Sequence, residues 1–163
     1  MKKILSALIV STLVCTAVAL SACGPNEKVF EKNGIKITAT TGFVEKELLS
    51  VTIYLESVDK IITGLKETPG SAFPITKSLR EYTEATLTAN NLSSTPINLY
   101  SENGVVFEYF IYERTASDKD FKYLGVTKKS DQFFYLFNFA SENKNFDKFE
   151  QQFMDWAKLI EVE

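Results

Sequence analysis

Two stretches of the sequence, residues 107–112 and 133–139, are rich in apolar side chains on both of the faces that a strand would have. A strand with one face in water alternates apolar and polar residues, whereas these two stretches do not. Such strands belong in the middle of a sheet whose two faces are both covered. The rest of the chain must therefore supply elements with apolar surfaces that cover both faces of this sheet.

Two other segments have the spacing of amphipathic helices. Apolar side chains recur every three or four positions in residues 77–90 and again in residues 145–159. Ser78 and Glu81 fit a capping box, which predicts the start of the first helix. The apolar stripe of the second helix consists of Phe146, Phe149, Phe153, Trp156 and Ile160. We expect one helix on each face of the sheet.

Alternation with period two, bounded by turn residues, predicts the strands. They are residues 35–38, 51–56, 61–67, 97–100, 104–114, 121–127 and 132–140. The expected fold class is α+β: a mostly antiparallel sheet sandwiched between two helices, in an α/β/α arrangement.

The order of these elements resembles the PsbP-like family over residues 33–163. The similarity lies in a two-strand hairpin, a helix, three long antiparallel strands, the segment FFYLFNF at 133–139, and a last helix ending in DWAKLIEV at 155–162. That family includes an extrinsic photosystem II subunit and many bacterial lipoproteins. The resemblance implies a PsbP-like fold and a role in binding or assembly rather than catalysis. It implies no site residue.

The N-terminus has the pattern of a secretory signal. Lys2 and Lys3 precede an apolar stretch, and small residues follow it up to Cys23. The sequence Leu-Ser-Ala-Cys at 20–23 resembles the bacterial lipobox. This resemblance implies that residues 1–22 are a lipoprotein signal peptide and that Cys23 carries the lipid. The alternative is an uncleaved membrane-spanning helix, and both interpretations place the domain outside the cytoplasm.

The polar residues after Cys23 predict a tether. Residues 24–33 open with Gly-Pro and contain no long apolar run, so we expect 23–33 to form the lipidated Cys and a short tether, and 34–163 to form a single domain. Ten extended residues reach at most roughly 35 Å. The domain is therefore expected to act close to the membrane to which Cys23 anchors it.

Composition excludes several classes of chemistry. The chain has no His, and its two Cys lie at 15 and 23, so Ser-His-Asp catalysis, imidazole ligation and a disulfide within the domain are all excluded. We expect no cofactor and no catalytic or metal site, with weak metal binding at Asp118 and Asp120 left open. The net charge of −3 argues against nucleic acid as a partner.

The expected function is binding near the membrane, with a protein partner at the membrane surface. Phe73, in the loop at 68–75, is a candidate contact residue, and the alternative is that it packs beneath the first helix. Two other functions remain open: a carboxylate-based hydrolase acting on a cell-envelope polymer, and a carrier of a small ligand or ion.

Overall fold

The structure is a computed structural model, and it describes residues 26–163 of the chain. That part contains ten strands and two helices. The strands are β1 (Glu27–Lys32), β2 (Ile35–Thr40), β3 (Val44–Glu45), β4 (Ile53–Glu56), β5 (Ile61–Glu67), β6 (Asn98–Glu102), β7 (Val105–Ala116), β8 (Lys119–Lys129), β9 (Phe134–Glu142) and β10 (Glu161–Val162). The helices are α1 (Leu79–Ala89) and α2 (Asn143–Lys158). None of the helices in residues 26–163 has the length and hydropathy needed to cross a membrane.

Seven strands form the main sheet, in the order β3-β4-β5-β9-β8-β7-β6, and every neighbouring pair is antiparallel. The strand β9, which contains most of the apolar segment 133–139, lies at the centre between β5 and β8. The strand β7, which contains the segment 107–112, lies between β8 and β6. The prediction that both segments are internal strands is confirmed.

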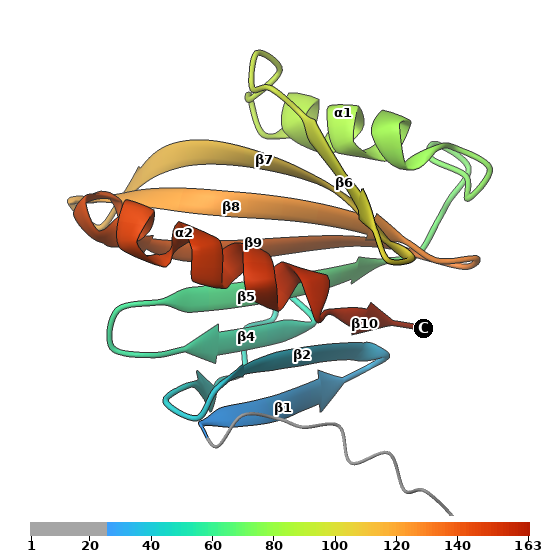
Figure 1. The fold of residues 1–163 in the computed structure, drawn as a ribbon. Helices are drawn as coiled ribbons and strands as arrows, with labels where there is room; N and C mark the ends of the chain where they lie inside the picture. Colours follow the sequence, from blue (N-terminus) through green and yellow to red (C-terminus); the bar gives the residue numbers. More distant parts are fainter. Residues whose placement is uncertain (1–25) are drawn as a thin grey trace, which may run out of the picture.

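The two helices lie on opposite faces of this sheet (Figure 1). Alternate residues of β9 point to opposite sides. Phe137 and Phe139 belong to the same core cluster as the aromatic stripe of α2. Phe134, from the other face, stacks on Tyr82 of α1 with ring centroids 4.6 Å apart. The expected α/β/α arrangement is therefore confirmed, and we call the side that carries α1 the α1 face.

A separate three-stranded sheet, in the order β1-β2-β10, corrects the expected tether. Residues 27–32, expected to lie in the tether, form β1 and pair with β2 along its whole length. Between them, Asn33 and Gly34 have φ angles of 48° and 77°, the conformation of a two-residue hairpin turn. The domain therefore begins several residues earlier than the expected boundary at residue 34.

This small sheet lies beside α2 and contributes to the same core (Figure 1). Phe30, Ile35 and Ile37 are almost completely buried. The ring of Phe43, just after β2, meets Trp156 of α2 edge-on at 5.5 Å. The main-sheet side that faces α2 is thus covered by the helix and the small sheet together.

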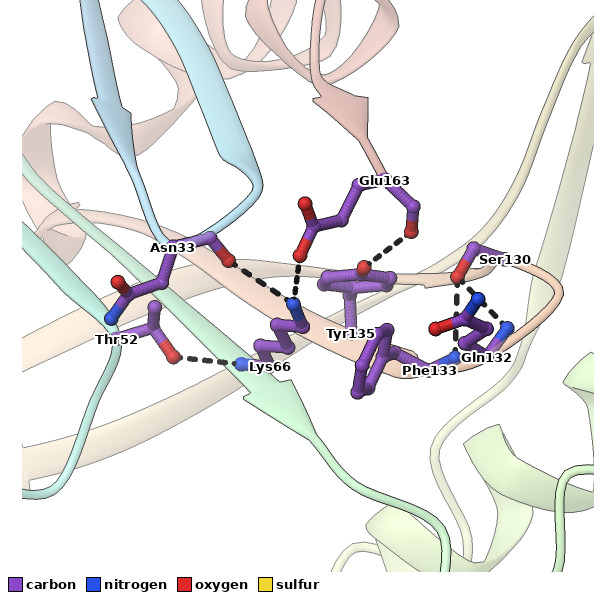
Figure 2. A network of polar contacts seen from close by, with 8 residues as sticks. All are labelled: Asn33, Thr52, Lys66, Ser130, Gln132, Phe133, Tyr135 and Glu163. Atoms are coloured by element: carbon purple, nitrogen blue, oxygen red, sulfur yellow. Dashed lines mark hydrogen bonds and ion pairs between the residues drawn. The ribbon is translucent and has the colours of Figure 1, made fainter.

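An ion pair and hydrogen bonds join the last residues of the chain to the main sheet and to the turn of the small sheet (Figure 2). The Lys66 ammonium, on β5, forms an ion pair with the Glu163 carboxylate and donates to the carbonyl of Asn33 at 3.3 Å. The Tyr135 hydroxyl, on β9, donates to the carbonyl of Glu163 at 2.7 Å. These contacts join the hairpin turn, the main sheet and the strand β10.

Candidate functional site

An open groove runs along α1 where the helix faces the main sheet. It has a volume of about 670 Å³. Its floor is formed by β5 and β9, one wall by α1, and the other wall by the loop between β5 and α1. The lining residues are Leu65, Glu67, Thr68, Pro69, Gly70, Phe73, Tyr82, Ala85, Thr86, Ala89, Asn90, Phe134 and Leu136. We call this feature the α1 groove.

The start of α1 is determined locally. The Ser78 hydroxyl accepts the backbone N–H of Glu81 at 3.1 Å, and the Glu81 carboxylate accepts the backbone N–H of Ser78 at 2.9 Å. The predicted capping box is therefore present. Hydrogen bonds from Lys77 and Ser78 lower the pKa of Glu81 to about 2. The first turn of the groove wall is consequently charged and capped at neutral pH.

Two contacts hold α1 against the main sheet. The Thr83 and Thr127 hydroxyls lie 2.7 Å apart in the buried interface. Arg80 reaches the buried Glu108 carboxylate at 3.0 Å. A charge-assisted contact of this kind also restricts the rotation of the helix over the sheet.

Aromatic rings line part of the groove. Tyr82 stacks on Phe134, and its hydroxyl donates to the Glu67 carboxylate at 2.6 Å. Burial raises the pKa of Tyr82 above its ordinary value, and the hydrogen bond to Glu67 raises it further. The groove therefore presents mainly aromatic and aliphatic groups, and its polar lining residues are Glu67, Thr68, Thr86 and Asn90.

Phe73, the candidate contact residue, lies half-buried in the loop wall of the groove. Its ring meets Tyr82 edge-on at 5.8 Å and Phe134 at 5.2 Å. The structure thus combines the two positions considered from the sequence, because Phe73 packs near α1 and also lines an open surface. Contact of Phe73 with a partner remains a prediction.

Two carboxylates, Glu56 and Glu142, lie close together at the other end of the sheet. Glu56 and Glu142 line a pocket of about 280 Å³ near the β4–β5 turn. A hydrogen bond from Lys46 lowers the pKa of Glu56, and hydrogen bonds from Lys119 and Lys144 lower the pKa of Glu142 to about 2. A glycosidase pair needs one acid that keeps its proton near neutral pH. Both pKa shifts have the opposite direction.

Asp118 and Asp120 lie at the β7–β8 hairpin tip. Ser117 and Asp118 have φ angles of 51° and 61°, which form the turn, and the Asp120 carboxylate accepts the Thr115 hydroxyl at 2.6 Å. Within residues 26–163 no group of three His, Cys, Asp or Glu side chains is placed to hold a metal ion. The other predicted site residue, Cys23, lies outside the described residues.

The arrangement of the strands and helices is similar to that of solved structures. Cyanobacterial PsbP (CyanoP) from Synechocystis sp. PCC 6803 matches with a TM-score of 0.64 at 14% sequence identity, over 88% of this chain and 99% of that one. The chain has a PsbP-like fold. At this identity the likeness establishes the fold alone.

A second solved structure, from Bacteroides thetaiotaomicron VPI-5482, matches with a TM-score of 0.56 at 9% identity. It covers 85% of this chain and 48% of that chain, so the PsbP-like domain spans about half the length of the Bacteroides protein. No protein-family model matches the sequence, and no curated protein sequence matches it.

Most residues of the α1 groove were not singled out by the sequence pattern. Leu65 and Leu136 are adjacent in the β5–β9 register and form its floor. The alternation of Leu65 and Leu136 with residues of the opposite face indicates strands. It does not indicate that the helix above leaves both side chains half-exposed. The useful signal was the apolar second face of β9, which showed that this side needed a cover.

Proposed function

We propose that this chain is a lipid-anchored, extracytoplasmic binding protein whose α1 groove holds an extended apolar segment of a protein partner. The observation that carries this proposal is the groove itself. It is open, about 670 Å³ in volume, and lined mainly by aromatic and aliphatic side chains such as Phe73, Leu65 and Leu136. Apolar surface left accessible in this way is typical of binding sites.

The N-terminal sequence supports the location. Lys2 and Lys3, the apolar stretch and the Leu-Ser-Ala-Cys sequence have the order of a lipoprotein signal. Two or three acyl chains at Cys23 would anchor the protein stably, whereas one chain binds a membrane only marginally.

The position of β1 supports a location close to the bilayer for a domain that is anchored at Cys23. Because β1 begins at Glu27, the connection from Cys23 spans four peptide steps and reaches at most roughly 14 Å. The helix α1 lies away from β1, beyond the main sheet (Figure 1). The groove therefore faces partners beside or above the anchored domain rather than the lipid directly beneath it.

The carboxylates support binding over hydrolysis. Glu67 is the acidic residue that lines the groove, and its carboxylate accepts the Tyr82 hydroxyl. Hydrolysis of a glycosidic bond normally uses two carboxyl groups across the scissile bond. The pair formed by Glu56 and Glu142 lies in a different pocket, and both of these acids are held in the charged form.

Site-specific photo-cross-linking in intact cells tests the proposal. A photoreactive residue replaces Ala85, which is exposed and lines the groove. The matched control replaces Glu84, which is also exposed and lines a separate depression beside α1. We expect one abundant protein adduct from position 85 and none from position 84, and we expect Cys23→Ala to abolish the adduct by releasing the domain from the membrane.

Equal adducts from both positions would reject the groove as the binding site. An adduct that persists unchanged with Cys23→Ala would reject the need for an anchor. A small-ligand carrier is the second candidate, because the groove volume also suits a small molecule. Native mass spectrometry of the purified domain showing a bound small molecule, with no protein adduct in cells, would favour that candidate over the proposed function.

A further inference from the structure

A second surface on the α1 face carries aromatic and polar groups that the groove does not use. The helix α1 contacts β7 and β8 near one end of the sheet, and the α1 face of β4 and of the other ends of β7 and β8 lies beyond it (Figure 1). Tyr54 of β4, Tyr112 of β7 and Tyr123 of β8 lie there, and all three are half-buried. We call these residues the tyrosine face.

We call these three side chains the platform, and two of its rings are stacked on each other. Tyr112 and Tyr123 are directly paired in the β7–β8 register and stack with centroids 4.8 Å apart and planes within 8°. Burial raises the pKa of all three, so each hydroxyl is neutral and can both donate and accept a hydrogen bond.

Side-chain hydrogen bonds cross the platform between the rings. The Tyr112 hydroxyl donates to Asn138 Oδ1 at 3.0 Å. The amide nitrogen of Asn138 then donates to the Thr63 hydroxyl at 3.4 Å. This chain orients the Asn138 amide and leaves further hydrogen-bonding capacity on each of the three groups. The platform thus offers the uncovered parts of the tyrosine rings together with the hydrogen-bonding groups of Asn138 and Thr63.

Arg114 supplies an uncompensated positive charge at the edge of the platform. Its guanidinium lies 5.5 Å from the Tyr112 ring centroid, and Nη2 donates to the carbonyl and side-chain oxygens of Asn90, each at 3.1 Å. Among residues 26–163 no carboxylate forms an ion pair with Arg114. The acidic groups near this end, Glu56 and Glu142, are themselves paired with lysines.

A small pocket lies next to this guanidinium, between α1 and the sheet. Its volume is about 150 Å³, and its lining includes Phe110 and the polar residues Arg114, Asn90, Asn138 and Tyr112. A planar carboxylate is the anion that a guanidinium fork recognises best, by two parallel hydrogen bonds. The pocket is large enough for such a group, and the tyrosine face extends away from it.

From these observations we infer that the tyrosine face binds a carboxylate-bearing sugar, with the carboxylate at Arg114 and the pyranose ring against the uncovered parts of the tyrosine side chains. A pyranose has C–H groups on its faces, which suit aromatic rings, and hydroxyls at its edge, which suit Asn138 and Thr63. The unpaired charge of Arg114 selects an acidic sugar over a neutral one. Sugar binding here does not require that the α1 groove holds a protein.

Titration of the purified domain with tetragalacturonate tests the inference, with the fully methyl-esterified tetramer as the matched neutral ligand. We expect the acid to bind and to shift backbone amide resonances of Arg114, Asn138 and Tyr123. We expect Arg114→Gln to weaken binding by about tenfold, which corresponds to the loss of one charge-assisted contact. Lys148→Gln removes a positive charge from the exposed side of α2 and should leave the affinity unchanged.

Tyr54→Leu provides a second variant, because it removes a platform ring without disturbing the stacked pair, and it should also weaken binding. Thermal unfolding of each variant verifies that the fold is retained. Equal affinity for the acid and its ester, equal affinity of Arg114→Gln and the unchanged domain, or no binding at millimolar tetragalacturonate would each overturn the inference. None of these results bears on cross-linking from position 85, so the two proposals can fail separately.

Discussion

Lys128 shows how a single residue makes the stability of this domain depend on pH. Its side chain is 8% exposed, its Nζ donates to the carbonyl of Ile160 at 2.5 Å, and the Phe107 ring centroid lies 5.9 Å away. Burial lowers the pKa of Lys128 from 10.5 to about 8. Keeping the ammonium charged in this position therefore costs free energy.

The pH dependence of unfolding has a definite sign at this residue. Between about pH 8 and 10.5 the unfolded chain keeps a proton on Lys128 that the folded chain has lost, so the free energy of unfolding rises with pH. The full contribution is about 3 kcal/mol. We expect Lys128→Met to lack this rise, as measured by urea unfolding across that range. Parallel pH profiles for the two proteins would contradict the role of Lys128.

Gly125 occupies a position where tertiary contacts leave no space for a side chain. A Cβ atom at this position would overlap the ring of Phe110, which lies over the glycine from the neighbouring strand β7. Gly64 is similarly confined, since a Cβ there would lie 2.8 Å from Ile53 and 2.9 Å from Phe137. These two positions let large rings lie flat against the strands on both faces of the main sheet.

At the scale of elements, the start of α1 follows from a short local signal, whereas β1 was not predicted although its hairpin turn carries one. The capping box at Ser78 and Glu81 was read correctly from the sequence. The pair Asn33-Gly34 is a strong signal for a two-residue hairpin, yet the polar residues before it predict a tether. The apolar residues of β1 are Val29 and Phe30, which are adjacent and do not alternate with polar residues, so the sequence does not show the pattern of a strand. In the structure Phe30 is buried and Val29 is 39% exposed.

Replacing Ser78 tests the local contribution to the groove wall. Ser78→Ala removes the hydroxyl that accepts the Glu81 N–H, and we expect it to lower the free energy of unfolding by about 1 kcal/mol. Ser78→Asp is the control, because aspartate also accepts that N–H and should retain most of the stability. Chemical denaturation measures both. Equal destabilisation by the two substitutions would show that the cap contributes nothing.

At the scale of the whole molecule, the anchor and the fold are expected to be independent. Cys23 lies before the described residues, and β1 begins at Glu27. Cys23→Ala should therefore move the protein from the detergent phase to the aqueous phase in phase partitioning, with an unchanged thermal unfolding midpoint. Cys15→Ala, which alters the other cysteine, should leave the protein in the detergent phase. A Cys23→Ala protein that still partitions with detergent would reject lipidation at this residue.

The sequence by itself determined both helices, most of the strands and the two-sided cover of the main sheet. These features depend on periodicity, and alternating or three-to-four spacing is written directly in the residues. The apolar segments at 107–112 and 133–139 placed β7 and β9 inside the sheet, and the stripe led by Phe146 identified α2.

Only the tertiary structure decided which distant residues meet. The pairing of β10 with β2 joins the two ends of the domain, and the contact of Arg114 with Asn90 and the Tyr112 ring depends on how α1 lies over the sheet. The α1 groove exists because a helix shorter than the face beneath it leaves part of that face open. Such properties arise from the packing of whole elements against one another, which local periodicity does not encode.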